Sequence, residues 1–253
     1  MPPFSFKFFL SVFGEVLPYF PVTLLIIVTS IIFSSLLGAL VASGQLSRSP
    51  IWRTLSQGYV FVLRSTPPIV LLFLVFYGLP KLLLLSLNIN INDWQKSIFV
   101  IIALSLLFAS NLAEVFKSAY LSVNTGQREA ALMVGLSEWQ TSYRITLPQT
   151  IVVALPNFAN TVAALIKDAA LAYVIGLLDM MGAGDNLISR NFGHHSLETY
   201  LALAIIYWIL FVIIEQGAKY LEIYLGKSRA NNIINYRCVI AHWFAAWLFI
   251  GMD

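Results

Sequence analysis

Five long apolar runs dominate the sequence, and each is about as long as the ~20 residues that a helix needs to cross a lipid bilayer. They cover residues 22–42, 57–79, 98–120, 151–178 and 200–220. The chain is 59% hydrophobic and only 11% charged, whereas soluble domains carry about 25% charged residues. In lipid these runs must be helical, because each backbone N–H and C=O group needs a partner within its own segment. The sequence therefore predicts an all-α, polytopic membrane protein with about five transmembrane helices.

Charged residues between the runs set the expected orientation. Five spans place the two termini on opposite sides of the membrane. With the N-terminus outside, nine Lys and Arg residues fall inside and four fall outside, as the positive-inside rule favours. The first run is longer than the core of a cleaved signal peptide, which is about 7–15 residues. We therefore expect a retained first span, an N-terminus outside and a C-terminus in the cytoplasm.

A compact charged segment, residues 124–149, lies on the cytoplasmic side in this orientation. Its residues 129–134, EAALMV, contain good helix formers. Gly135 follows them, at the position where a left-handed residue ends many helices. Ser137 and Gln140 then have the spacing of a capping box, which starts a helix. The expected unit is a helix, a glycine turn and a second helix.

The second helix of this unit is expected to run to about Arg144. Pro148 should stop it, because proline disfavours helical backbone in the residue before it. One side of the unit should be small and apolar, and this side contains Ala130, Ala131, Val134 and Leu136. The unit is either a surface loop that folds back on its own spans or a docking element for a cytoplasmic partner.

Catalytic and metal-binding groups are scarce. Cys238 is the only cysteine, so neither an intrachain disulfide nor a cysteine metal cluster can form. His194 and His195 are adjacent, but a zinc site needs further ligands. Neither a nucleophile–base set nor a G-x-x-x-x-G-K-[ST] phosphate loop is visible, and the dispersed basic residues argue against nucleic-acid binding. We therefore expect no enzyme, no metal site and no cofactor in this chain.

Four motifs, in order along the chain, resemble those of one transporter family. GQREAALMVGLSEWQTSYRITLPQ is similar to the EAA loop of bacterial ABC-importer permeases. The matching positions are Glu129, Ala130, Ala131, Gly135, Ile145, Leu147 and Pro148. LRSTPPIVLLFLVFYGLP, NLAEVFKSAYLSVNTGQ and LPNFANTVAALIKDAALAYVIG resemble segments of polar amino-acid permeases. The likeness covers roughly residues 23–225.

This resemblance implies the permease subunit of an ATP-driven importer for polar amino acids in a bacterial inner membrane. In that family the EAA loop docks into a groove of a separate cytoplasmic ATPase, which binds ATP and Mg²⁺. The permease then opens alternately to the two sides. Further implied partners are an extracytoplasmic amino-acid-binding protein and a second permease, identical or homologous, in the same bilayer.

The resemblance also implies a division of the chain. Residues 22–225 form the permease domain, with the coupling loop at 124–149, preceded by an external segment 1–21 and followed by a tail 226–253. The short apolar stretch 238–252 is below the length of a span, and either lies at the membrane interface or has no role.

Four positions depart from the family pattern. Ser65 replaces a usual glycine and Lys117 replaces a usual arginine. Ala169 and Ala170 stand where the family has Thr and Ser in its K-D-T-S-L run. The loss of these two hydroxyl groups leaves the transported amino acid open but does not affect the expected transport role.

An arginine next to a helix break is the first candidate for the translocation path. Charges near the bilayer centre cost at least about 2.5–3.5 kcal/mol on insertion scales, so they are functional candidates. Arg64 precedes Thr66, Pro67 and Pro68, and the prolines remove backbone donors and break the second span. Broken helices expose backbone groups to the path in transporters. One interpretation is that Arg64, Thr66 and Pro67 line the path. The other is that Arg64 snorkels to lipid headgroups.

Lys167 and Asp168 are the second candidates, deep in the fourth run. Adjacent residues on a helix do not face each other, so each needs another partner. They contact the carboxylate and ammonium groups of an amino acid, form structural ion pairs with other spans, or lie at an extracellular helix end. Asn160 either bonds another helix or faces the path. Glu114 and Lys117 are three residues apart and are expected to form a structural pair.

An ion-coupled secondary transporter or channel is the alternative function. Inverted-repeat carriers show two related halves, and no second half of this chain repeats the first.

Overall fold

The computed structural model describes residues 4–226, and all regular secondary structure in that range is helical. Five helical stretches of this part are long and apolar enough to cross a membrane. They are Phe6–Gln45, Pro68–Leu87, Lys96–Leu121, Glu138–Ile175 and Ser196–Gly217. The predicted all-α class and the predicted number of spans are therefore confirmed. The apolar stretch 238–252 lies outside the described residues.

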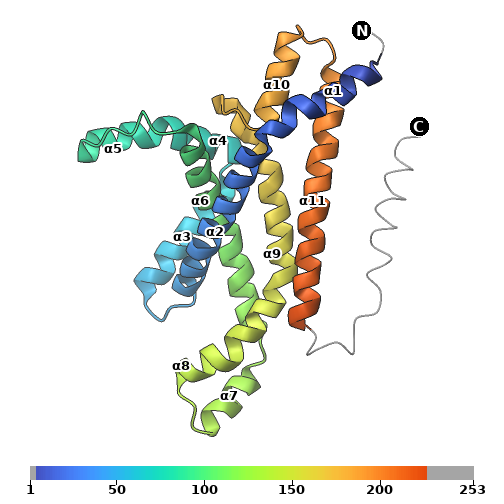
Figure 1. Ribbon diagram of the computed structural model, residues 1–253. Helices are drawn as coiled ribbons and strands as arrows, with labels where there is room; N and C mark the ends of the chain where they lie inside the picture. The colour runs from blue at the N-terminus through green and yellow to red at the C-terminus, as the bar shows by residue number, and fades with distance from the viewer. Residues whose placement is uncertain (1–3, 227–253) are drawn as a thin grey trace, which may run out of the picture.

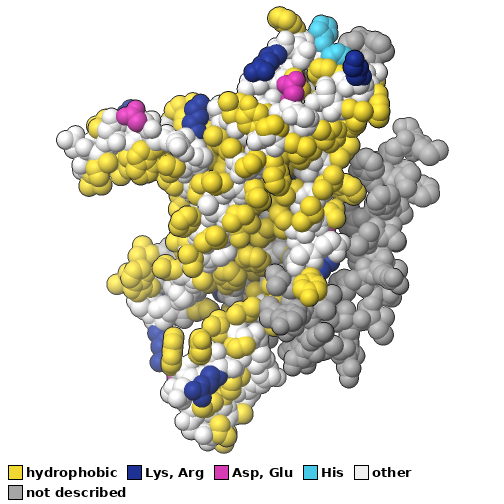
Figure 2. All heavy atoms as spheres, viewed as in Figure 1, with side chains coloured by type: hydrophobic (Ala, Val, Ile, Leu, Met, Phe, Trp, Pro, Cys, Tyr) yellow, Lys and Arg dark blue, Asp and Glu magenta, His cyan; other side chains and the backbone are white. Residues whose placement is uncertain are grey.

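The spans connect two ends of an elongated molecule (Figure 1). One end, the hairpin end, is formed by α7 (Thr125–Met133) and α8 (Glu138–Thr141). The opposite end, the α10 end, contains α10 (Met180–Arg190) and the start of α1 (Phe6–Val16). Figure 2 shows hydrophobic side chains over the middle of the visible face and cationic side chains towards the two ends. This distribution fits a bilayer around the middle.

Helices α2 (Phe20–Gln45) and α6 (Lys96–Leu121) make the most extensive contact between elements. Gly38 permits this close approach: a Cβ atom there would lie 2.9 Å from Leu112 Cβ and 3.1 Å from the Ala109 carbonyl oxygen. Small residues at helix crossings let backbones come together where lipid provides no hydrophobic drive between helices. The α2–α6 pair is therefore the centre of the bundle.

The two larger clusters of buried side chains organise the rest. The larger one joins α2 and α6 to α9 (Leu147–Ala169), through residues such as Ile27, Phe108 and Leu165. The smaller one lies at the α10 end, where Val12 of α1 and Met180 of α10 pack against α11 (Ser196–Gly226). The short 3-10 segment Leu17–Tyr19 links α1 to α2.

The second span differs from the sequence expectation. Helix α3 (Pro50–Ser65) is separate, and the span begins at Pro68 with α4 (Pro68–Phe73), a π-helical turn (Leu74–Gly78) and α5 (Leu79–Leu87). The predicted range 57–79 is therefore wrong. Thr66 and Pro67 are extended, with ψ angles of 125° and 139°. Pro68 then occupies the first helical position, where its missing N–H costs nothing, so the prolines start the span and do not interrupt it.

The expected stop of the second hairpin helix near Arg144 is also wrong. The helix continues through a π-helical turn, Ser142–Thr146, into α9. The Leu147 N–H bonds to the Ser142 carbonyl, five residues back. Proline normally removes an i to i−4 hydrogen bond, and the π turn before Pro148 absorbs this defect. With the 3-10 segment Ala170–Ile175, Glu138–Ile175 is one continuous helical stretch of 38 residues, which bends between α8 and the long part of α9 (Figure 1).

Candidate functional site

The α7–α8 hairpin turns at Gly135, as the sequence predicted. Gly135 has φ +90°, the left-handed region. Its N–H bonds to the Leu132 carbonyl at 3.0 Å, and the Leu136 N–H bonds to the Ala131 carbonyl at 3.2 Å. This pair of hydrogen bonds is a Schellman motif, which satisfies the last carbonyls of a helix. The turn is therefore specified locally by one glycine.

The start of α8 confirms the predicted capping box. Ser137 Oγ accepts the Gln140 N–H at 3.2 Å, and Gln140 Oε1 accepts the Ser137 N–H at 2.9 Å. The start of α7 is capped in the same manner, because Asn124 Oδ1 accepts the Gly126 N–H at 2.8 Å. Side chains thus satisfy backbone donors at both helix starts.

The apolar side of the hairpin is only partly as predicted. Ala131 is buried and Leu136 is half-buried, but Ala130 and Val134 face outward. Met133 is 89% exposed. Met133 was not among the residues predicted from the sequence, although an apolar residue close to a glycine turn in a charged loop is a usable signal.

Two aromatic residues extend this exposed surface. Trp139 is 76% exposed and stacks on Tyr143, with ring centroids 6.3 Å apart. We call the surface formed by Met133, Val134, Trp139 and Tyr143 the hairpin tip. Exposed aromatic and methionine side chains are enriched at protein interfaces, so this tip is suited to contact another protein.

An ion pair joins the two hairpin helices. The Arg128 guanidinium donates to the Glu138 carboxylate, and this partner raises the pKa of Arg128. Gln127 and Gln149 also contact each other, which links α7 to the start of α9. The hairpin is therefore fixed both internally and to the long helical stretch, while Glu129 remains exposed.

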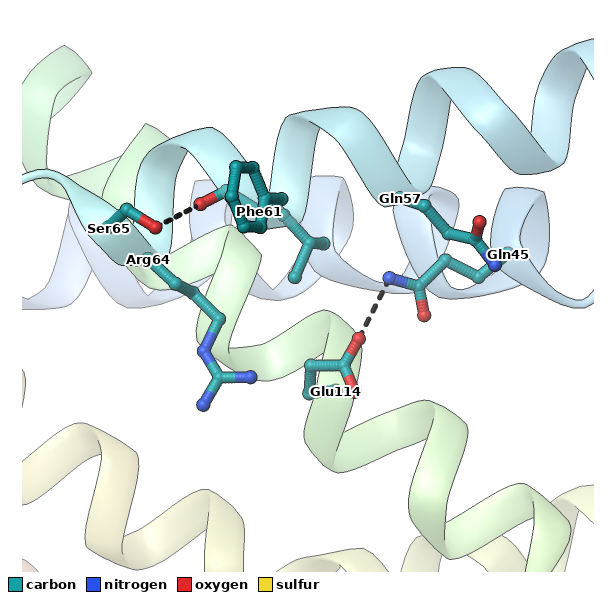
Figure 3. Close-up of a pocket in the computed structure, with 7 residues that line it drawn as sticks. Gln45, Gln57, Phe61, Arg64, Ser65 and Glu114 are labelled. Atoms are coloured by element: carbon teal, nitrogen blue, oxygen red, sulfur yellow. Dashed lines mark hydrogen bonds between the residues drawn. The ribbon is translucent and has the colours of Figure 1, made fainter.

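A wide-open cavity of about 400 Å³ with polar and apolar lining lies between α2, α3 and α6 (Figure 3). Its lining residues are Gln45, Gln57, Val60, Phe61, Arg64, Ser65 and Glu114. Gln45 Nε2 donates to Glu114 Oε1 at 2.9 Å, and Lys117 Nζ lies 3.4 Å from the same oxygen. The predicted Glu114–Lys117 pair is therefore confirmed, and Glu114 also faces a cavity that the sequence did not predict.

The cavity offers both signs of charge. Figure 3 shows the Arg64 guanidinium and the Glu114 carboxylate directed towards the same opening, from α3 and α6. Within residues 4–226, Arg64 forms no salt bridge. The buried Gln45 Oε1 atom also has no hydrogen-bond partner there. Unpartnered polar groups of this kind are available to a ligand that carries both donors and acceptors.

The other predicted site residues lie elsewhere. Thr66 Oγ1 donates to the Val62 carbonyl at 2.8 Å, at the break that follows α3. Lys167 Nζ lies 5.6 Å from the centre of the Phe211 ring, a cation–π contact between α9 and α11. Asn160 and Lys167 are exposed and Asp168 is half-buried, and none of the three lines the cavity of Arg64. The structure therefore does not bring the two groups of candidates into one cavity.

A buried acidic residue lies at the start of α10. Asp179 is fully buried, and its Oδ1 accepts the Gly182 N–H at 2.9 Å. Thr23 Oγ1 of α2 accepts the adjacent Met180 N–H at 3.1 Å. Burial raises the pKa of Asp179, while the Gly182 N–H opposes this rise. The Asp179 Oδ2 and Tyr207 hydroxyl atoms are buried without a partner in the described part of the chain.

Metal ligands are not grouped in this fold. Among residues 4–226, no three His, Cys, Asp or Glu side chains lie together in the way that a metal site requires.

Comparison with known protein families gives one match over most of the chain. Residues 34–223 match the family described as the binding-protein-dependent transport system inner membrane component. The L-cystine transport system permease protein TcyL of Bacillus subtilis is 38% identical over 230 residues, which cover 89% of this chain and 95% of TcyL. The probable amino-acid permease protein YxeN of the same organism is 36% identical over 213 residues, or 84% and 92% of the two chains.

Solved structures share the fold. A chain of an amino acid ABC transporter crystallised with histidines superposes with a TM-score of 0.76 at 23% identity, over 87% of this chain and 99% of that chain. A chain of the inward-facing MetNI methionine ABC transporter gives a TM-score of 0.66 at 18% identity, over 88% and 99%. At these identities the likeness establishes the arrangement of helices.

Proposed function

The chain belongs to the binding-protein-dependent transport inner membrane components and is the permease subunit of an amino-acid ABC importer, and on this premise we propose that its α7–α8 hairpin is the contact with the ATPase. As a permease, the chain has no catalytic activity of its own. It is a multi-pass inner membrane protein that works with an ATPase and a periplasmic binding protein. The hydrolysis of ATP-Mg takes place in the separate ATPase.

The hairpin tip and the EAA positions carry the proposed coupling. Glu129, Ala130 and Gly135 form the motif face, next to Met133 and Val134, which leave apolar surface uncovered. Ala131 supports this face from inside, and Leu147 and Pro148 join it to α9. The observation that carries this proposal is the continuous helical stretch Glu138–Ile175, in which α8 leads directly into α9. A push on α8 is therefore passed directly into α9, the helix that carries Lys167 and Asp168.

The cavity between α2, α3 and α6 is the proposed part of the substrate path. A polar amino acid carries a carboxylate, which suits Arg64, and an ammonium group, which suits Glu114. The resemblance to TcyL, which is named for L-cystine, supports an amino-acid substrate of this zwitterionic kind. The extended Thr66–Pro67 break lies directly beside Arg64. Asn160, Lys167 and Asp168, which lie further along α9 towards the α10 end, are proposed to serve an earlier section of the path, during the other half of the alternating cycle.

The topology and assembly follow the same proposal. The hairpin end faces the cytoplasm, the N-terminus lies outside and the C-terminus lies inside. Residues 22–225 form the permease domain, with 1–21 as an external segment and 226–253 as a tail. A single five-span chain does not enclose a path, so a second permease, identical or homologous, completes it.

The coupling proposal is tested with Glu129→Lys and Gly135→Pro in the complete importer. Proline cannot adopt the positive φ of Gly135, so this change removes the turn. Both variants should insert normally but lose uptake and co-purification with the ATPase. Glu15→Lys, a charge reversal of an exposed glutamate in α1, is the matched control and should retain both. Uptake that survives both hairpin changes would disprove the assignment.

A further inference from the structure

Two hydrophobic side chains stand out from the rest of the surface, and they lie at opposite ends of the molecule. Phe192 is 92% exposed and Met133 is 89% exposed, the highest values among the large hydrophobic side chains described in residues 4–226. Met133 belongs to the hairpin tip. Phe192 lies in the loop between α10 and α11, at the α10 end (Figure 1). Function has been proposed for the first of these positions only.

The two positions are built on the same backbone motif. After α7, the N–H groups of Gly135 and Leu136 bond to carbonyls three and five residues back. After α10, the Phe192 N–H bonds to the Ser189 carbonyl at 3.1 Å and the Gly193 N–H bonds to the Ile188 carbonyl at 3.0 Å, which are the same intervals. Both loops are therefore Schellman turns.

The residue in the left-handed position differs between the two turns. Glycine fills it after α7, whereas Phe192 fills it after α10, with φ +53°. Left-handed backbone is unfavourable for a residue with a Cβ, and for a bulky side chain it is a real outlier. Such strain persists where the surroundings enforce it and often marks a functional residue. A glycine would form this turn more easily, so the phenyl ring itself requires an explanation.

The surroundings hold this loop rigidly. Asn191 Nδ2 donates to the Leu187 carbonyl at 2.8 Å, and Ser196 Oγ donates to the Gly193 carbonyl at 2.6 Å. His195 also has positive φ, at +61°. Its Nδ1 lies 3.1 Å from Glu198 Oε1, a buried carboxylate. Because the loop is already ordered, binding through the phenyl ring should cost it little conformational entropy, as for a preorganised anchor.

The N-terminal helix supports the loop from the side. The Glu198 Oε1 atom also accepts the Ser5 N–H at 2.9 Å. The His195 ring stacks on Phe8, with centroids 4.2 Å apart. The start of α1 and the start of α11 are thus joined directly behind the loop, which fixes its base.

The neighbours of Phe192 are polar and cationic, which does not fit burial in lipid. Arg190 and His194 are exposed on either side of it. Helix α11 has 31 residues, or about 46 Å at 1.5 Å per residue, whereas the hydrocarbon core is about 30 Å thick. Helix α11 is therefore long enough for the loop before it to lie outside the hydrocarbon core, in water. An apolar ring with a cationic rim suits a protein surface that has an apolar socket and acidic edges.

We propose that Phe192 is the anchor by which the permease engages its extracytoplasmic binding protein, with Arg190 as a rim contact. This inference rests on the proposed function, since it places the α10 end outside. A single rigid aromatic side chain that enters a socket fits the behaviour of interface hot spots.

The decisive variant is Phe192→Gly in the reconstituted importer, because it removes the ring and also relieves the left-handed strain. The probe is the purified, amino-acid-loaded binding protein that stimulates ATP hydrolysis by the wild-type importer. We expect unchanged or higher thermal stability, unchanged basal ATPase activity and a half-saturating binding-protein concentration raised at least tenfold. Phe6→Ala, at another exposed aromatic position of the same end, is the control and should not change it.

A merely structural role for Phe192 gives the opposite pattern. Lower thermal stability of Phe192→Gly together with wild-type half-saturation would overturn the proposal. A wild-type importer that no binding protein stimulates would overturn the proposed arrangement and this inference together. Wild-type stimulation with an unaffected Phe192→Gly variant would overturn this inference alone.

A label separates protein contact from lipid contact. Phe192→Cys in a Cys238→Ser background is labelled with an environment-sensitive fluorophore in lipid nanodiscs. We expect emission typical of water, which shifts to the blue when the loaded binding protein is added. Blue-shifted emission before that addition, quenched by spin-labelled lipid, would place residue 192 in the membrane and reject the proposal.

Discussion

Arg128 of α7 and Glu138 of α8 form an ion pair across the Gly135 turn, with Nη2 2.6 Å from Oε2. The two side chains are 45% and 56% exposed, so water screens most of their attraction. The turn itself depends on Gly135 and on the Ser137–Gln140 capping box, which need no charge. The hairpin therefore forms without the ion pair, which only adjusts the angle between α7 and α8.

Loss of this pair should have a small effect. For Arg128→Ala we expect a stability cost of about 0.5 kcal/mol or less, in the range measured for exposed pairs, and a fall in uptake of no more than about twofold, the change in an equilibrium constant that this energy corresponds to. The measurement is uptake by the double variant that exchanges the charges, Arg128→Glu with Glu138→Arg. It is compared with uptake by each single variant. A tenfold loss in Arg128→Ala that the exchange does not restore would show that Arg128 contacts the ATPase directly.

Gly38 should tolerate a side chain poorly, because it lies where the two central helices cross. In Gly38→Ala the new Cβ meets the Ala109 carbonyl oxygen and Leu112 Cβ at 3.1 and 2.9 Å, and overpacking costs about 1–3 kcal/mol. Gly58 in α3 has no atom within 4 Å of such a Cβ. Gly58→Ala should therefore be neutral or stabilising by about 0.5–1 kcal/mol, as expected inside a helix.

Thermal unfolding of the two detergent-solubilised variants checks this contrast. The melting temperature of Gly38→Ala should lie below that of the wild type, and that of Gly58→Ala should not. Equal melting temperatures would mean that α2 and α6 adjust without cost.

The hairpin could be predicted because its rules are local. Gly135 and the Ser137–Gln140 box act over a few residues, so their geometry follows from the sequence. The limits of the second span could not be predicted in this way, because Pro67 and Pro68 have two possible consequences. They can break a helix or begin one, and only the packing of α3 and α4 around α6 selects the second.

Tertiary contacts explain the other differences. Gln45 and Glu114 are 69 positions apart, and no sequence pattern showed that they share a cavity with Arg64. Asp179 was not singled out from the sequence, but the fold buries it fully. The roles of Arg64, Lys167 and Asp168 in transport stay predictions, since each depends on a bound substrate.

Arg64→Ala should weaken substrate recognition and leave the assembly with the ATPase intact. A lost hydrogen bond between charged groups costs about 1.5–3 kcal/mol, which corresponds to a rise in the KM for uptake of tenfold or more. Arg53 lies on the same helix, but its guanidinium donates to the Ser47 carbonyl and does not line the cavity. Arg53→Ala is therefore the matched control and should keep the wild-type KM.

Glu114→Gln tests the other charge of the same cavity. It should also raise the KM, because the ammonium group of the substrate loses its carboxylate partner. Normal kinetics in both cavity variants would remove this cavity from the path, whereas loss of ATPase co-purification would point to a structural role.

The stability of the α10 end should depend on pH through Asp179. Burial raises the pKa of this carboxyl group in the folded protein, so the folded state binds the proton more tightly than the unfolded state. Stability should therefore be highest below the ordinary carboxyl pKa and should fall as pH rises from there towards the raised pKa. Asp179→Asn keeps an acceptor for the Gly182 N–H and has no proton to lose.

The melting temperatures of the wild type and Asp179→Asn, measured from pH 4 to pH 8, test this sign. The melting temperature of the wild type should fall relative to that of Asp179→Asn as pH rises, because only the wild type must ionise a buried group. Asp179→Leu, which lacks the capping oxygen, should melt lower than Asp179→Asn at every pH, by about the 1 kcal/mol that an N-cap contributes. A wild type that gains stability over Asp179→Asn with rising pH would show that the buried carboxylate is stabilised in its charged form, for instance by the Tyr207 hydroxyl.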